Sequence, residues 1–249
     1  MTGRRPVPSD ELGVWFPAVQ VGTGADVFTE QLCAGLNRIG IRAEVSWLPA
    51  RAEYMPWSVA VPRAPAWARM VHVNTWLHRR FVPAHLPVVA TMHLCVHDPA
   101  LAPYKTRAQA LYHRCWVKPL EAWVLKRASK VAAVSHYTAS RTQSAFGCQP
   151  IHTIVNGVPL SVGMATRAAR EPDQPFRLLY VGNWLQRKGV DLLGPIMRQL
   201  GQGFELRYTA DARGAHERAT TLLPANCINI GRLSRQQVSQ AYRQADALL

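Results

Sequence analysis

The stretch FRLLYVGNWLQRKGVDLL, residues 176–193, joins a short apolar run, a polar loop and a segment with helical periodicity. The apolar run has the length of a buried strand, Gly182 opens the loop, and apolar residues recur at helical spacing after Gly189. Such strand–loop–helix units build parallel sheets, because parallel strands need a crossover connection. Arg187 and Lys188 then stand between the end of a strand and the start of a helix, where an anion is favoured. An ordinary exposed turn with two solvated charges is the alternative.

The same alternation extends from this stretch to the amino terminus. A passage rich in proline and tryptophan, residues 49–67, interrupts it and is expected to run over the surface. A long helix is expected over residues 104–128, with Leu111 and Trp116 on its apolar side and a kink at Pro119. We therefore predict the α/β class. Six strands are expected in this part of the chain, at residues 13–16, 43–48, 70–73, 88–92, 131–134 and 151–155.

Residues 161–175 lack apolar periodicity and mix small, charged and proline residues, as interdomain linkers do. We place one domain at residues 1–160 and a second at 176–249. The second domain is expected to contain strands at 177–181, 204–208 and 228–230, and helices at 189–200, near 215–223, and at 234–244 after a Ser234–Gln237 capping box. Residues 247–249 read as the beginning of a fourth strand, so the second domain is predicted to be incomplete.

Composition narrows the class of protein. The formal net charge of +14 over 249 residues attracts polyanions, whether nucleic acid, anionic lipid or a substrate phosphate. Nucleic acid is not expected as a partner, because no binding motif accompanies the eight tryptophans. The five cysteines form no CxxC pair, and no signal peptide or membrane span is evident. A cytoplasmic protein is therefore expected.

Two further places carry candidate site residues. The loop containing Gly22, Thr23 and Gly24 lies between a strand and a helix, where backbone N–H groups can approach a phosphate or sugar; a tight structural turn is the alternative. His93 follows the strand at 88–92 and should lie at its carboxyl end, where open α/β sheets bind ligands, unless it is a structural histidine. His93, Cys95 and His97 alternate but lack a fourth ligand, so we expect no metal.

Five blocks give the sequence a family resemblance. They occur in the order and approximate spacing found in retaining glycosyltransferases of family 4, and the match is looser over residues 1–90. The likeness implies a GT-B fold, in which two Rossmann-like domains face each other across a cleft. The acceptor binds mainly to the first domain and the nucleotide-sugar donor to the second, without a metal or cofactor. The blocks are TMHLCVHDP (91–99), ASKVAAVSHYTASRTQSAFG (128–147), IHTIVNGVPL (151–160), LLYVGNWLQRKGVDLL (178–193) and INIGRLSRQQVSQAYRQADALL (228–249).

The resemblance also implies roles for single residues of the second domain. Lys188 matches the lysine that neutralises the donor diphosphate, and Arg187 would be an auxiliary cation. Gly182 would allow the donor to approach closely, whereas Asn183 stands where the family usually has a basic residue. Gly231 and Leu233 fall where the family lines its nucleobase pocket.

In the first domain, the resemblance assigns Gly22 and Gly24 to an amino-terminal glycine loop and His93 to the surroundings of the transferred sugar. Asn156 and Gly157 correspond to an interdomain turn. Two departures stand out. The segment TADARGAHE, residues 209–217, replaces a frequent GxG turn, and the family's two donor-binding glutamates would follow residue 249. The resemblance thus implies a member truncated at its carboxyl end.

Together, these observations predict a hexosyltransferase that moves a sugar from a nucleotide-diphosphate donor to a glycan or lipid-linked acceptor, with retention. Polysaccharide or lipopolysaccharide assembly is the expected setting. The cations of the helix at 104–128 are compatible with peripheral contact with anionic membrane, at the inner face of the cytoplasmic membrane. The alternative is a non-catalytic remnant or binding module that holds acidic glycan or lipid phosphate on its basic surface.

Overall fold

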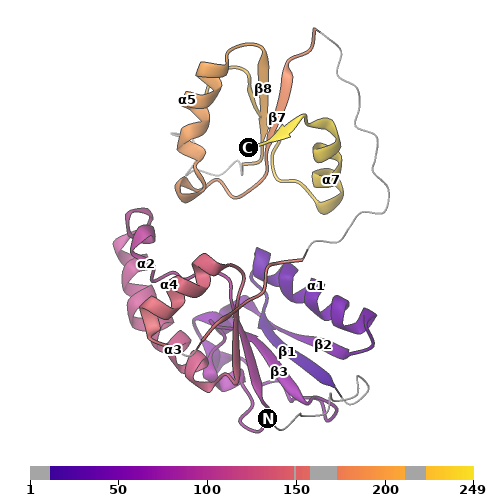
Figure 1. Cartoon of the computed structure of the whole chain (residues 1–249), viewed down its shortest axis with the longest axis vertical. Coiled ribbons are helices and arrows are strands. Elements are labelled where there is room, and N and C mark those ends of the chain that lie inside the picture. The colour runs from indigo at the N-terminus through magenta and orange to yellow at the C-terminus, as the bar shows by residue number, and fades with distance from the viewer. Residues whose placement is uncertain (1–11, 149, 158–172, 211–222) are drawn as a thin grey trace. The chain divides into compact units, whose positions relative to one another are not determined.

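A computed structural model describes residues 12–148, 150–157, 173–210 and 223–249. The chain divides into two compact units, Met1–Val158 and Pro159–Leu249, and each is described by itself (Figure 1). The predicted linker at 161–175 begins just after this division, and most of it lies outside the described residues. None of the helices in the described residues is long and apolar enough to cross a membrane.

The first unit contains a six-stranded sheet in the order β2-β1-β3-β4-β5-β6, in which every pairing is parallel. The six predicted strands are confirmed, although the last covers only two residues. Ile154 and Val155, which were expected to continue it, have exposed side chains, although the Ile154 N–H still donates to the Ala133 carbonyl at 2.9 Å. The strands are β1 (Gly13–Val19), β2 (Arg42–Leu48), β3 (Met70–Asn74), β4 (Val88–Met92), β5 (Lys130–Ala133) and β6 (His152–Thr153).

The chain runs from β1 to β2 in one direction and from β3 to β6 in the other. Right-handed crossovers therefore place α1 (Gly24–Arg38) on one face of the sheet, and α3 (Lys118–Arg127) and α4 (His136–Phe146) on the other, as Figure 1 shows. The reversal between β1 and β3 creates a switch point at the carboxyl ends of these strands, where such sheets bind ligands. Ser135 caps α4 as predicted, since its hydroxyl accepts from the N–H of Thr138.

The single helix predicted over residues 104–128 is wrong in detail. A 3-10 segment, Pro99–Tyr104, precedes α2 (Arg107–Tyr112), and a π-helical segment, His113–Val117, joins α2 to α3. Pro119 has no N–H to donate one turn back and its ring crowds that turn, so the widened turn replaces the expected kink. Leu111 was expected on the apolar side, yet its side chain is exposed, whereas Val124 and Leu125 are buried.

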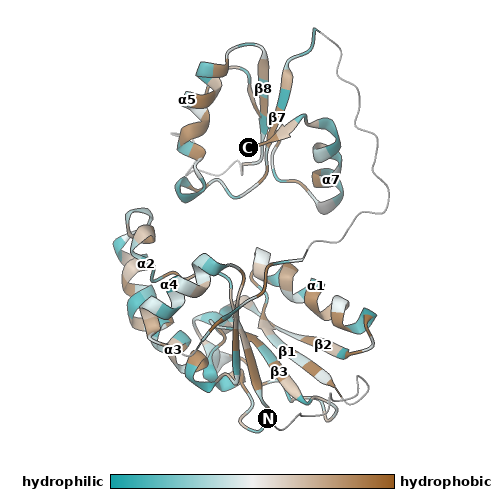
Figure 2. Ribbon diagram, in the orientation of Figure 1, coloured by the Kyte–Doolittle hydropathy of each residue, from teal (hydrophilic) through white to brown (hydrophobic). Residues whose placement is uncertain are grey.

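Side chains between the sheet and its helices form the core of the first unit. Figure 2 shows hydrophobic residues along much of both sheets, with hydrophilic residues on the outer sides of the helices. Burial of these strand side chains removes apolar area from water and is the main favourable term in folding. The core includes Trp15, Val71, Val73, Val88, Ala90, Met92, Leu125 and Val131.

The second unit contains a four-stranded parallel sheet in the order β10-β7-β8-β9. The fourth strand expected at 247–249 is present and pairs with β7, and the Ser234–Gln237 capping box is confirmed. The helix expected near 215–223 lies almost entirely outside the described residues. The elements are β7 (Phe176–Tyr180), α5 (Val190–Leu200), β8 (Phe204–Tyr208), β9 (Cys227–Asn229), α7 (Arg235–Gln244) and β10 (Ala247–Leu248), with a 3-10 turn at Gln186–Lys188.

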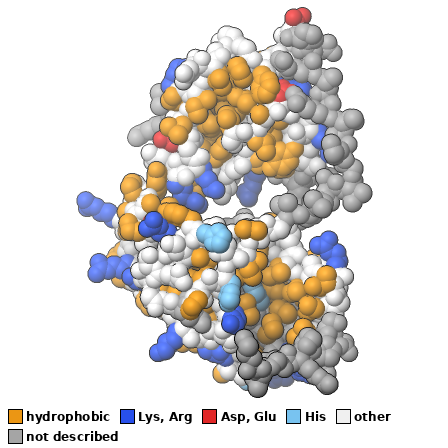
Figure 3. Space-filling view, in the orientation of Figure 1, with side chains coloured by type: hydrophobic (Ala, Val, Ile, Leu, Met, Phe, Trp, Pro, Cys, Tyr) orange, Lys and Arg blue, Asp and Glu red, His pale blue; other side chains and the backbone are white. Residues whose placement is uncertain are grey.

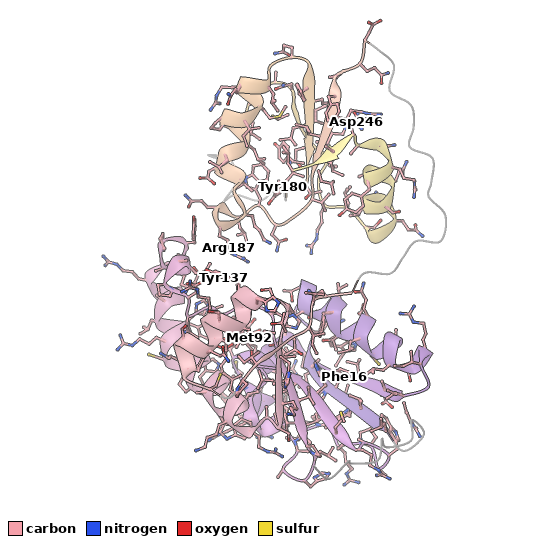
Figure 4. All side chains as sticks on the ribbon, viewed as in Figure 1. Phe16, Met92, Tyr137, Tyr180, Arg187 and Asp246 are labelled. Carbon is pink, nitrogen blue, oxygen red and sulfur yellow. The ribbon has the colours of Figure 1, made fainter. Side chains whose placement is uncertain are left out.

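An ion pair that the sequence did not predict ties β10 to β7. The Asp246 carboxylate, which is fully buried, receives hydrogen bonds from Arg177 Nε at 3.1 Å, Arg177 Nη2 at 3.2 Å and the Arg177 backbone N–H at 2.7 Å. Figure 4 places Asp246 at the end of the sheet opposite to Tyr180, which lies at the carboxyl end of β7. This pair holds the amino-terminal ends of the two strands together.

Candidate functional site

A cavity of about 450 Å³ opens in the first unit at the switch point of its sheet. We call it the first-unit cavity. The carboxyl ends of β1, β3 and β4 supply much of its wall, and the start of α1 supplies another part. Thr23 and His93, which the sequence singled out, both line it, whereas Gly22 and Gly24 do not. The remaining walls include Pro17, Val19, Asp26, Thr29, Trp47, Glu53, Tyr54, Asn74, Thr75, Trp76, Leu77, Leu94 and Val96.

The glycine loop in front of α1 is held by a residue that sequence analysis missed. The buried carboxyl group of Asp26 accepts hydrogen bonds from the N–H groups of Val21 at 2.9 Å and Gly22 at 2.7 Å. Gly22 adopts a φ of 73°, which favours glycine. Two donors that the sequence offered to a phosphate are therefore occupied within the chain, and Thr23 is the loop residue that faces the cavity. An acidic residue in the first turn of the predicted helix was the available signal.

His93 lies against a second aromatic ring on the cavity wall. Its imidazole packs edge-on against Phe28, with ring centroids 4.6 Å apart, and burial lowers the pKa of His93. Behind it, His72 Nε2 lies 3.0 Å from Thr91 Oγ1, and burial together with nearby His93 lowers the pKa of His72 to about 4. Near neutral pH the His72 ring is uncharged, and the shift favours the uncharged form of His93. An uncharged imidazole can both donate and accept a hydrogen bond.

Flat apolar surfaces and a few polar groups make up the rest of this wall. Trp47, Tyr54 and Trp76 contribute aromatic rings, while Asn74 and Glu53 contribute polar groups. Burial raises the pKa of the Glu53 carboxyl, and a hydrogen bond from the Tyr112 hydroxyl, at 3.4 Å, opposes that rise. An apolar cavity with a few fixed polar groups suits a small molecule that presents both C–H faces and hydroxyls.

A buried carboxyl group supports this wall from behind. Glu121, on α3, has no exposed surface, and its Oε1 accepts from Thr75 Oγ1 at 3.1 Å and from Trp76 Nε1 at 2.9 Å. Its Oε2 lies 2.9 Å from His97 Nε2. Thr75 and Trp76 are thereby fixed in the cavity wall. Sequence analysis missed Glu121, because a single acidic residue in a helix gives no sign of which side chains face it across the fold.

The three alternating residues lie in different surroundings. His93 packs on Phe28, Cys95 is buried, and His97 binds Glu121. Burial, the largest cause, raises the pKa of the Cys95 thiol, which disfavours a metal-binding thiolate. Over the residues that the structure describes, no three histidine, cysteine or acidic side chains are grouped so that they could hold a metal ion.

The second unit has a pocket of about 430 Å³ at the carboxyl ends of β7 and β8, which we call the second-unit pocket. Gly182, Asn183 and Leu233, all predicted site residues, line it together with Arg232, a cation that sequence analysis passed over. The Gly182 N–H donates to Thr209 Oγ1 at 3.0 Å, and the same hydroxyl donates to the Gly182 carbonyl at 3.1 Å. The two loops that form the floor of the pocket are therefore tied to each other.

Trp184 anchors the loop that follows β7. Its side chain is buried against Tyr180 and Tyr208, with ring centroids 5.8 and 4.6 Å away. Tyr180 also donates from its hydroxyl to the Asn183 carbonyl at 3.2 Å. The indole Nε1 of Trp184 is buried without a hydrogen-bond partner in the described part of the chain. A large aromatic side chain thus anchors the loop.

Arg187 and Lys188 lie in the 3-10 turn at the end of this loop, next to the start of α5. Both side chains are exposed, and neither forms an ion pair with a described residue. Gly189 takes a φ of 76° between the turn and the helix. Figure 4 shows Arg187 at the same end of the sheet as Tyr180, the end that also forms the pocket. The two cations do not line the pocket itself but stand in the loop that frames it.

Three further predicted residues, Gly231, Asn156 and Gly157, also line neither hollow. Gly231 has a φ of 70° and precedes the pocket residues Arg232 and Leu233 without lining the pocket. Asn156 and Gly157 are exposed after β6, close to the end of the described part of the first unit. Their role in an interdomain turn stays a prediction.

Several solved structures with a similar fold are glycosyltransferases. A glycosyltransferase from Rickettsia africae aligns with a TM-score of 0.61 at 12% identity, over 95% of this chain and 72% of that one. The lipopolysaccharide outer core galactosyltransferase WaaB gives 0.55 at 15% identity over 95% and 73%, and Anabaena HepE, crystallised with UDP and glucose, gives 0.54 at 15% over 95% and 73%. At these identities the likeness establishes the fold, which is GT-B. No curated protein sequence matches the chain.

The sequence itself matches one family over more than half of its length. Residues 22–162 fit the sequence model described as Glycosyltransferase Family 4. The matched region begins at the glycine loop, includes His93 and the residues around Glu121, and extends past Asn156 and Gly157. With a GT-B fold, a ligand-sized cavity at the switch point of the first sheet and this sequence match, the chain belongs to glycosyltransferase family 4.

Proposed function

We propose that the chain transfers a hexosyl group from a nucleotide-diphosphate sugar to a glycan or lipid-linked acceptor, with retention of configuration. The observation that carries this proposal is the exposed Arg187–Lys188 turn at the start of α5, beside the second-unit pocket. When the donor bond breaks, the departing diphosphate gains charge that must be stabilised in the transition state. Two cations without ion-pair partners among the described residues, placed near a helix amino terminus, meet this need without a metal.

The second-unit pocket supports a nucleotide-sugar donor. Its floor is backbone and small side chains at Gly182 and Thr209, which leaves room for a ligand close to the main chain. Arg232 adds a third cation at its edge. Asn183 occupies the position where the family usually carries a basic residue, and we propose that Arg187 takes over that contact. The presence of UDP and glucose in Anabaena HepE is consistent with a donor of this class.

The first-unit cavity supports an acceptor that carries hydroxyl groups. In the proposed reaction His93 hydrogen-bonds a hydroxyl of the transferred sugar as it reaches the acceptor, and its burial favours the uncharged ring that can do so. Trp47 and Trp76 offer flat faces on which a sugar ring can lie. Because one relative is a lipopolysaccharide outer core galactosyltransferase, lipopolysaccharide or another polysaccharide is the acceptor class that we propose. Peripheral contact with the inner face of the cytoplasmic membrane belongs to the same proposal.

The proposal predicts that a nucleoside diphosphate stabilises the protein through Lys188. Thermal melts with a panel of UDP, GDP and ADP, without added metal, should show a rise in Tm for at least one of them. Lys188→Gln should weaken the binding of that nucleotide by roughly tenfold to a hundredfold, because a hydrogen bond to a charged group contributes about 1.5–3 kcal/mol. Arg187→Gln should weaken it less.

Arg243→Gln is the matched control, since Arg243 is an exposed cation of the same unit that does not line the pocket. A stabilisation that is unchanged in Lys188→Gln, or equally reduced in Arg243→Gln, would count against the donor site. Binding to anionic vesicles without any nucleotide response would favour the alternative, a non-catalytic binding module.

A further inference from the structure

The first unit contains a second hollow, of about 280 Å³, between the Pro99–Tyr104 segment, α2 and the π-helical turn. Two small residues, Ala102 and Ala110, form part of its wall. All the other lining residues carry nitrogen groups, and none of the described lining residues is acidic. We call this hollow the cationic pocket; its nitrogen-bearing residues are His97, Lys105, His113, Arg114 and Lys118. Figure 3 shows Lys and Arg side chains gathered on the side of the first unit that carries these helices.

The carboxyl groups nearest to the cationic pocket are already bound by other donors. Glu121, behind His97, accepts hydrogen bonds from Thr75 and Trp76 as well. Asp98 accepts from the Tyr137 hydroxyl at 2.5 Å and from the Ala100 N–H at 3.0 Å, and it lies 3.9 Å from Arg141. Asp98 also interacts electrostatically with Lys105, but neither acid forms an ion pair with Arg114 or Lys118. Positive charge in the pocket is therefore left for a ligand.

Two side chains show that the pocket is organised rather than a chance gathering of surface charges. The Lys105 ammonium group donates a hydrogen bond to the Val96 carbonyl, which holds it at the wall without neutralising its charge. His113 Nδ1 is buried and has no partner among the described residues. Burial lowers the pKa of His113, and its electrostatic interactions with Lys105 and His97 lower it further. A buried polar atom without a protein partner can be satisfied by a group bound in the pocket.

The π-helical turn brings the helical cations together. His113 and Arg114 belong to that turn, and Lys118 follows it at the start of α3. A π-helical turn widens the helix and is frequent at functional sites. Here it is accompanied by Arg114 and Lys118 lining one hollow together with His113. The departure from the predicted continuous helix thus coincides with the pocket.

The cationic pocket shares a wall with the first-unit cavity. Trp76 lines the cavity, and its ring centroid lies 5.9 Å from that of His113, which lines the pocket. Val96 lines the cavity, whereas the next residue, His97, lines the pocket. A ligand in the cavity is therefore separated from the cationic pocket by about one layer of side chains.

We propose that the cationic pocket binds a phosphate group carried by the acceptor whose sugar occupies the first-unit cavity. The proposal rests on the proposed function, because it takes the cavity to be the acceptor site. The three cations and two imidazoles of the pocket offer more charge and more donors than one carboxylate group of a ligand could pair with. A phosphate monoester, by contrast, carries up to two charges and three acceptor oxygens. Arg114 supplies a planar guanidinium, which suits bidentate binding of phosphate.

The test measures phosphate binding to the full chain without any nucleotide. Inorganic phosphate and glucose 1-phosphate are titrated at constant ionic strength, while NMR follows the His97 and His113 rings. The expected result is saturable binding that raises the pKa of His113. The double variant Arg114→Gln/Lys118→Gln should weaken binding at least about tenfold, since each lost contact is one to a charged group. The control Arg107→Gln/Lys126→Gln removes two charges from the same helices but outside the pocket and should bind normally.

A third arm distinguishes the sources of the phosphate. Vesicles of phosphatidylglycerol or of neutral lipid are added, and competition of the anionic vesicles with glucose 1-phosphate identifies a lipid-linked phosphate as a ligand of the same pocket. Equal losses in the two double variants would overturn the proposal in favour of diffuse surface charge. So would vesicle binding without any phosphate response. If Arg114→Gln/Lys118→Gln fails to fold by circular dichroism, the wild-type titration decides, because an unchanged His113 pKa then overturns the pocket.

The outcomes are separable from those of the donor test. Loss of the nucleotide response through Lys188 would remove the proposed function while leaving phosphate binding in the first unit intact. A normal nucleotide response with no phosphate binding would remove only the cationic pocket.

Discussion

The first-unit cavity and the second-unit pocket hold their polar groups in opposite ways. Around the cavity, Asp26 and Glu121 are buried and take up the hydrogen bonds of neighbouring groups, so that Thr23, Thr75 and Trp76 are held in place. Beside the pocket, Arg187 and Lys188 are exposed, and an apolar anchor, Trp184, holds their loop. The difference fits a site that must recognise a neutral polyhydroxyl group and one that must supply free positive charge.

Replacing Glu121 should have the largest effect on the wall of the first-unit cavity. In Glu121→Ala, the hydroxyl of Thr75 and the indole N–H of Trp76 lose their buried partner, and a cavity is left behind. We expect a loss of roughly 3–5 kcal/mol in the free energy of unfolding, since each buried unsatisfied donor costs about 1–3 kcal/mol and the void adds to this. Urea unfolding followed by tryptophan fluorescence measures the effect.

Glu44→Gln, on an exposed position of β2, is the control and should change stability by no more than about 0.5 kcal/mol. The two variants should leave nucleotide binding to the second unit unchanged. If Glu121→Ala proved as stable as Glu44→Gln, the buried hydrogen bonds would not be what holds the cavity wall.

The stability of the first unit should depend on pH through the buried His72. Because burial and His93 lower the pKa of His72 to about 4, the folded state favours an uncharged ring, whereas the unfolded chain titrates near 6.5. The stabilisation is fully present above about pH 6.5 and is lost as the pH falls towards 4. A shift of this size corresponds to about 3 kcal/mol of stability.

His72→Gln, which cannot take up a proton, should flatten this part of the stability profile between pH 4 and 6.5. His152→Gln, at an exposed position of β6, should leave the profile unchanged. The measurement is the free energy of unfolding at a series of pH values, and parallel profiles for the wild type and His72→Gln would contradict the assignment.

Much of the fold followed from local pattern, and little of the cavity did. Strands such as β4 and β7 are short, mostly apolar runs bounded by glycine, proline or polar residues, so their signals are complete within a few residues. The position of Lys188 before α5 followed for the same reason. By contrast, the bonds from Thr75 and Trp76 to Glu121 span 46 and 45 residues, and only the packed fold brings them together. The π-helical turn was missed because Pro119 predicted a break without predicting its form.

The smallest expected effect is at the anchor of the second unit. Trp184→Phe removes a buried indole N–H that has no partner in the described residues, which is favourable by about 1 kcal/mol. It also leaves space beside Tyr208, which costs a comparable amount. The net change in the free energy of unfolding should be under about 1 kcal/mol, and the Arg187–Lys188 turn should keep its place.

Because Trp184 also lines the second-unit pocket, the affinity for a nucleoside diphosphate reports separately on its role in ligand binding. Affinity within about threefold of wild type means that the ring serves only as an anchor, whereas a tenfold loss at unchanged stability means that its N–H donates to the ligand. In that event the second unit, like the first, would use a buried polar group for recognition. The two hollows would then differ only in the sign of the charge that each presents to its ligand.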